Sequence, residues 1–170
     1  MDIEAWMNLV KVDVFKTLER AVGVHGSAEV PAAMQQLEGY YKIEGFVEAL
    51  ITVLRGECST LNSDMSLMAI ICLKNVVKRS WTNRGGGDDT HVLIAQDKNG
   101  LKEYLLGYES FHIENEKVWL QVVSLVAIVA RLDWPEVVPR LLQMRENIRK
   151  DEELRTETRI LCVLAHVLEV

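Results

Sequence analysis

One stretch of the chain places cations and an amide close together. In LKNVVKRSW, residues 73–81, Lys74 and Lys78 are four positions apart and Asn75 follows Lys74. Residues at this spacing share one side of an α-helix, so the three side chains form a narrow polar row. Such a row suits electrostatic docking of a partner, and it is equally consistent with a plain solvated face.

Two further predicted helices carry similar rows. In the segment 114–132 the row consists of Lys117, Gln121, Ser124 and Arg131. In the segment 152–170 it consists of Arg155, Arg159, Cys162 and His166. A narrow polar strip on an otherwise apolar helix is typical of the inner helices of a solenoid, where stacked strips line an extended concave surface. The alternative is a compact helical bundle with solvated faces.

Charged rows alone give little affinity. Each exposed ion pair contributes only about 0–1 kcal/mol, so tight binding needs an apolar anchor as well. Ile71 lies in the polar arc of its helix and is one candidate. Trp119 is a second, although core packing is the role we expect for it.

The sequence offers little support for catalysis or metal binding. Asp88, Asp89 and His91 lie close together in GGGDDTH, but a glycine-rich loop is a poor preorganised site, and its glycines do not form a P-loop. The other three histidines are far apart, and the three cysteines, Cys58, Cys72 and Cys162, lack metal-ligand spacing. We therefore expect reduced thiols, no metal, no cofactor and no enzymatic activity.

Composition narrows the class of protein. A net charge of −6 and an isoelectric point near 5.3 argue against a nucleic-acid binder, which is usually basic. The longest apolar run, residues 118–132, is too short and too polar to cross a bilayer, so we expect no membrane insertion. The acidic start, MDIEAWMNL, lacks the basic region of a signal peptide.

Hydrophobic periodicity predicts an all-α protein. Eight helices are expected. Six of them span about 3–22, 46–56, 63–81, 96–106, 114–132 and 152–170. The second helix begins near Pro31, and the seventh follows DWPEVVP and ends at Ile148. Asp133 and Glu136 have the spacing of a capping box for the seventh helix. The pattern predicts a right-handed HEAT-repeat α-solenoid of about four antiparallel pairs: residues 1–44, 45–82, 96–134 and 135–170, with a Gly/Asp-rich loop at 83–95.

Several segments, taken in order, resemble the N-terminal region of the importin-β (karyopherin) family. MAIICLKNVVKRSW is similar to the family's A-x-x-x-L-K-N-x-x-x-x-x-W run, and QQLEGYYKIEGFVEALITVL to its upstream Q-x-L segment. LVAIVARLDWPEVVPRLL and RTETRILCVLAHVLEV resemble the following repeats. VARLD and the R-x-x-x-R-x-L spacing resemble one subgroup of the family in particular.

The resemblance implies a nuclear transport receptor that shuttles between nucleus and cytoplasm. Its N-terminal repeats would bind the GTPase Ran in the GTP form on the concave inner helices, while the full-length receptor would bind protein cargo and nucleoporins. The Ran-binding candidates are then Ile71, Lys74, Asn75, Lys78, Lys117, Gln121, Ser124 and Arg131. A HEAT-repeat scaffold that assembles protein complexes without sensing a nucleotide state is the alternative.

Overall fold

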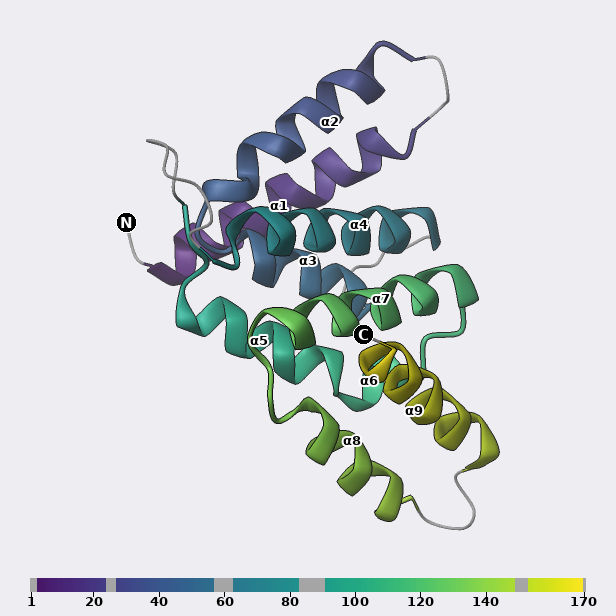
Figure 1. Cartoon of the computed structure of the whole chain (residues 1–170). Coiled ribbons are helices and arrows are strands. Elements are labelled where there is room, and N and C mark those ends of the chain that lie inside the picture. The colour runs from purple at the N-terminus through teal and green to yellow at the C-terminus, as the bar shows by residue number, and fades with distance from the viewer. Residues whose placement is uncertain (1–2, 24–26, 57–62, 83–90, 149–152, 170) are drawn as a thin grey trace. The chain divides into compact units, whose positions relative to one another are not determined.

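The described part of the chain folds into α-helices, as predicted. A computed structural model describes residues 3–23, 27–56, 63–82, 91–148 and 153–169, and no β-strand occurs within these ranges (Figure 1). The elements in chain order are α1 (Ile3–Ala21), α2 (Glu29–Gly39), the 3-10 turn η1 (Tyr40–Lys42), α3 (Phe46–Leu54), α4 (Ser63–Ser80), α5 (Ala95–Leu105), α6 (Tyr108–Phe111), α7 (Glu116–Asp133), α8 (Val137–Glu146) and α9 (Glu153–Leu168). The chain divides into two compact units, Met1–Lys102 and Glu103–Val170.

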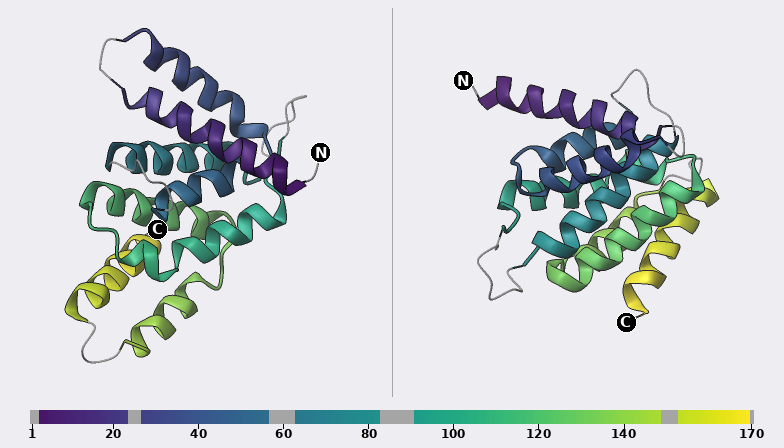
Figure 2. Two further views of the ribbon diagram at one scale, coloured as in Figure 1. Left: turned by 180° about the vertical axis from the view of Figure 1, so that it is seen from behind. Right: turned by 90° about the horizontal axis from the view of Figure 1, so that it is seen from above.

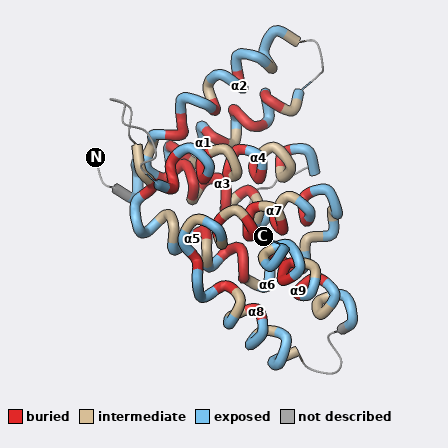
Figure 3. The backbone as a smooth tube through the Cα atoms, in the orientation of Figure 1, coloured by how far each residue is buried: buried red, intermediate tan, exposed pale blue. Residues whose placement is uncertain are grey.

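The first unit is built mainly from two antiparallel helix pairs. α1 pairs with α2, α3 pairs with α4, and α1 also packs against α3 (Figure 2). Val14, Leu50 and Leu73 come from three of these helices and are fully buried. Burying one such side chain contributes roughly 1.5–3 kcal/mol, so the apolar faces hold the pairs together. Figure 3 shows the buried positions on the sides of the helices that face one another.

A glycine sets the joint between η1 and α3. Gly45 has φ of +91°, in the left-handed region that side chains rarely adopt. A Cβ at this position would lie 2.6 Å from the Sδ atom of Met7 in α1. The left-handed backbone conformation therefore favours glycine here, whereas the flexible end of the Met7 side chain could shift to make room for a Cβ.

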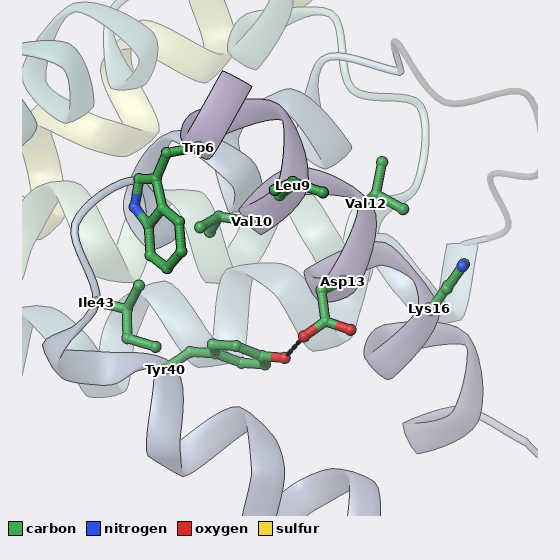
Figure 4. A pocket seen from close by; sticks show the side chains of 8 residues that line it. All are labelled: Trp6, Leu9, Val10, Val12, Asp13, Lys16, Tyr40 and Ile43. Atoms are coloured by element: carbon green, nitrogen blue, oxygen red, sulfur yellow. Dashed lines mark hydrogen bonds between the residues drawn. The ribbon is translucent and has the colours of Figure 1, made fainter. Parts of the chain in front are cut away.

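An apolar groove runs beside α1 (Figure 4). Trp6 and Leu9 line it together with Tyr40 of η1. The Tyr40 hydroxyl donates to the Asp13 carboxylate and accepts a 2.8 Å hydrogen bond from Nε2 of Gln36. Burial, and then the bond to Asp13, raise the pKa of Tyr40. This network ties η1 and α2 to α1.

The second unit contains α6 to α9. α9 packs against both α7 and α8. Asn115 caps α7, because its side-chain oxygen accepts hydrogen bonds from the backbone N–H groups of Lys117 (2.9 Å) and Val118 (3.3 Å). No helix within the described ranges is long and apolar enough to cross a membrane.

Three local features differ from the sequence prediction. The capping box is wrong: Asp133 is the last residue of α7, and Glu136 precedes α8 without a side-chain capping bond. The apolar period of α7 carries the helix through Asp133, so this residue cannot start the next one. Residues 40–42 tighten into a 3-10 turn, and the short helix α6 was not predicted. α6 is held by Ser110, whose hydroxyl oxygen lies 2.9 Å from the carbonyl oxygens of Leu105 and Gly107.

Candidate protein-binding surface

The row on α4 lies at the surface of the first unit. The opposite face of α4 is buried and consists of Met65, Ala69, Ile70, Cys72, Leu73, Val76, Val77 and Ser80. Lys78 is exposed, Lys74 and Asn75 are half-buried, and Ile71 is 37% exposed. Helical phase thus brings three polar residues and one apolar side chain onto one strip, and their role in binding stays a prediction.

The two lysines of this row influence each other. Burial, and then the positive charge of Lys78, lower the pKa of Lys74. Like charges one helical turn apart repel, so the row carries a small unfavourable term in the free protein.

Asn75 has a role within its own unit. Its side chain shares a hydrogen bond with the hydroxyl of Tyr41, whose pKa is raised mainly by burial. The Arg79 guanidinium lies 5.0 Å from the centre of the Tyr41 ring and 3.6 Å from the Glu38 carboxylate. Asn75 therefore helps to hold α4 on η1, and the charge of the row comes from Lys74 and Lys78.

The row on α7 lies in the second unit. Lys117 and Arg131 are exposed near the two ends of the helix, while Gln121 and Ser124 between them are half-buried. Arg131 sits in the last turn, where a cation interacts favourably with the helix dipole, whereas Lys117 sits in the first turn, where it does not. The position of Arg131 is therefore explained by its favourable interaction with the helix dipole, whereas that of Lys117 is not.

The predicted row on α9 is wrong at Arg159. This side chain was expected on an exposed strip, but Arg159 is only 4% exposed. Its Nη1 donates to the carbonyl oxygen of Phe111 at 2.8 Å, and its Nη2 donates to Glu116 Oε1 at 2.8 Å. The guanidinium also lies 4.5 Å from the ring centre of Trp119. Arg159 thus connects α9 to α6 and α7 instead of facing solvent.

Trp119 belongs to the core, as expected. It is 3% exposed and packs against Phe111, with ring centres 5.4 Å apart. Of the two anchor candidates, only Ile71 is therefore at the surface.

Of the thiols and histidines in the described ranges, Cys162 and His166 lie one turn apart on α9, with Sγ 3.9 Å from Nδ1, and the same Nδ1 lies 2.9 Å from the carbonyl oxygen of Cys162. Burial raises the pKa of Cys72 to about 12, so this thiol is a poor nucleophile, and burial also raises the pKa of Cys162. No group of three or more His, Cys, Asp or Glu residues in the described part of the chain could hold a metal ion. Asp88 and Asp89 of the loop lie outside the described residues.

Comparison with known families agrees with the motifs in the sequence. Residues 33–109 match the family model "Importin-beta N-terminal domain". This range includes α3 and the whole of α4 with its row.

Related proteins extend the likeness over most of the chain. The chain is 26% identical over 165 residues to Importin-11 of Homo sapiens, and equally to Importin-11 of Mus musculus, covering 95% of this chain and 16% of each relative. Importin-11 is the subgroup that the VARLD segment resembles. The chain thus spans about a sixth of the length of the curated relatives it matches.

A solved structure supports the fold. The exportin Cse1 in its cargo-free, cytoplasmic state matches 94% of this chain with a TM-score of 0.73 and 20% identity, over 16% of its own length. The likeness shows that the helix pairs belong to the HEAT-repeat α-solenoid class. Together with the ordered motifs, these comparisons confirm the resemblance to the importin-β family, whose N-terminal domain model matches residues 33–109.

Proposed function

We propose that this chain is the N-terminal segment of a nuclear transport receptor and binds Ran in its GTP form. The observation that carries the proposal is the importin-β N-terminal domain match over residues 33–109, which contains the α4 row. In this proposal the full-length receptor carries protein cargo through nuclear pores, contacts nucleoporins and shuttles between nucleus and cytoplasm.

The α4 row would act mainly through charge. Lys74 and Lys78 present two ammonium groups one turn apart, and Ile71 adds an exposed apolar side chain on the same strip. Because exposed ion pairs contribute only about 0–1 kcal/mol each, the lysines would set register and association rate more than affinity. The α7 row, with Lys117, Gln121, Ser124 and Arg131, would add further polar contacts from the second unit.

A titration with the two nucleotide states of Ran tests the proposal. The chain is titrated with Ran loaded with a non-hydrolysable GTP analogue and, in parallel, with Ran loaded with GDP. We expect clear preference for the GTP form. Equal affinity for both states would favour the scaffold alternative, and binding to neither would contradict the assignment of Ran binding to this chain.

A further inference from the structure

We propose that the groove between α7 and α9 binds an amphipathic helical segment of a partner protein that presents leucine-like side chains next to a carboxylate. The groove has a volume of about 590 Å³ and lies within the second unit. All of its lining residues come from α7 and α9, so the groove is separate from the α4 row that we propose for Ran.

Exposed leucines make the groove apolar. Leu120 of α7 is 54% exposed and Leu154 of α9 is 81% exposed, and both line the groove. Cys162 and the buried Trp119 complete the apolar part of the lining. Two large exposed aliphatic side chains beside a tryptophan resemble the centre of an interface, where a partner's apolar side chain removes them from water.

Charge selects the kind of partner. The Nη2 atoms of Arg159 and Arg155 approach the same oxygen, Glu116 Oε1, at 2.8 Å and 3.7 Å. One carboxylate therefore serves two guanidinium groups, and the groove keeps an excess of positive charge. A partner carboxylate complements that excess, whereas a partner lysine or arginine is repelled.

Arg155 is the residue that can take up this carboxylate. Its contacts are long, 3.5 Å to the carbonyl oxygen of Ile113 and 3.7 Å to Glu116, and its side chain is more than half exposed. A guanidinium can bind a carboxylate through two parallel hydrogen bonds, which are stronger than either present contact. Arg159 is fully engaged with Phe111 and Glu116, so it holds the wall of the groove while Arg155 recognises the acid.

A helical segment fits the shape and chemistry together. The groove follows the line where two packed helices meet, and such lines accept the apolar face of a third helix. Leucines one turn apart on that helix would contact Leu120 and Leu154, and an acid on the flank would reach Arg155. Two copies that met groove to groove would bring together two sites of excess positive charge, which disfavours that contact.

The test uses helical probe peptides with the whole chain. Each fluorescent probe has about 12 residues, two leucines one turn apart and one glutamate, which is moved along the helix from probe to probe. Binding is followed by fluorescence anisotropy against the wild-type chain. We expect at least one glutamate position to bind about three- to tenfold more tightly than its glutamine counterpart, and replacing the leucines by alanine to abolish binding.

Variants locate the binding. Leu120→Glu should abolish it, and Arg155→Gln should remove the preference for glutamate over glutamine while leaving residual apolar binding. Leu142→Glu on α8 and Arg145→Gln are the matched controls, since these residues are exposed in the same unit but do not line the groove. Circular dichroism of each variant checks that it is folded.

Four outcomes would overturn the proposal. The first two are that no probe binds the folded wild-type chain, and that Leu120→Glu leaves the binding unchanged. The other two are that glutamate and glutamine probes bind equally, and that the chain associates with itself through a contact that Leu120→Glu removes. The last would assign the groove to a second copy. Because no GTPase is present, each outcome is independent of Ran binding.

Discussion

The rows on α4 and α9 have the same spacing of basic residues in the sequence but different positions in the structure. On α4, Lys74 and Lys78 are four residues apart and lie on the surface strip. On α9, Arg155 and Arg159 are also four apart, yet Arg159 is buried and bonded to two acceptors. A pattern of cations at helical spacing thus does not by itself identify a docking surface.

The difference comes from the acceptors that surround each row. The carbonyl of Phe111 at the end of α6 and the carboxylate of Glu116 in the first turn of α7 both face Arg159. The planar guanidinium has donors in a fork that matches two acceptors at once, which a lysine ammonium does less well. An arginine beside a helix end and a carboxylate becomes a structural tie, whereas Lys78 on α4 is exposed.

The largest effect that sharpens this comparison is expected for Arg159→Ala. Loss of both hydrogen bonds and of the contact with Trp119 should lower the free energy of unfolding by about 2–4 kcal/mol. Lys78→Ala should change it by less than about 0.5 kcal/mol, because this side chain is exposed. Urea unfolding followed by circular dichroism measures both. Similar small losses in the two variants would remove the distinction between the rows.

Arg159→Lys tests whether the shape of the guanidinium matters. A lysine keeps the charge but cannot serve Phe111 and Glu116 together in the same geometry, so we expect a loss of about 1–2 kcal/mol. The same unfolding measurement applies. Stability equal to the wild type would show that charge alone holds α9 in place.

Asn75→Ala tests the one amide of the α4 row. Because Asn75 shares a hydrogen bond with Tyr41, its removal should cost about 1 kcal/mol of stability. Binding to Ran should fall less than in the lysine variants. A variant with unchanged stability but lost binding would move Asn75 from a structural role to a docking role.

The smallest effect concerns the pH dependence that Lys74 contributes. Its pKa in the folded state is lowered from 10.5, so the folded chain holds this proton less tightly than the unfolded chain does. At lower pH, keeping Lys74 protonated in the folded chain therefore lowers the free energy of unfolding. This loss disappears as the pH rises through the pKa of folded Lys74 toward 10.5.

Lys74→Gln isolates this contribution. The stability of the wild type relative to the variant should rise with pH as it approaches 10.5, and the titrating tyrosines common to both chains largely cancel. Equilibrium unfolding at several pH values gives this difference. If the difference in the free energy of unfolding between the two chains stayed constant or fell with pH, the pKa of Lys74 would not be lowered in the folded state.

Helix positions could be predicted from the sequence because apolar residues recur with the helical period. α1, α3 and α4 begin and end within about two residues of their predicted bounds. Local interactions were harder to predict. Asp133 has the spacing of a cap, but the buried face of α7 extends the preceding helix through it. The cap that α7 does use, Asn115, lies in a segment of mixed polar residues with several capping candidates.

The binding rows could be predicted only in part, for a similar reason. Helical phase was sufficient to place Ile71, Lys74 and Lys78 on one surface strip. It could not show that Arg159 meets the carbonyl of Phe111, 48 positions away. Nor could it show that Leu120 and Leu154 line one groove, since that depends on how α7 and α9 pack.

The most direct test of the account is the association rate of Ran in the GTP form with a charge-reversed α4 row. In Lys74→Glu with Lys78→Glu we expect the rate to fall about tenfold at low salt, and the loss to shrink at high salt. Lys16→Glu with Arg55→Glu makes the same change in net charge elsewhere in the first unit, and its rate should fall much less. Equal rates for the two double variants would contradict a docking surface on α4.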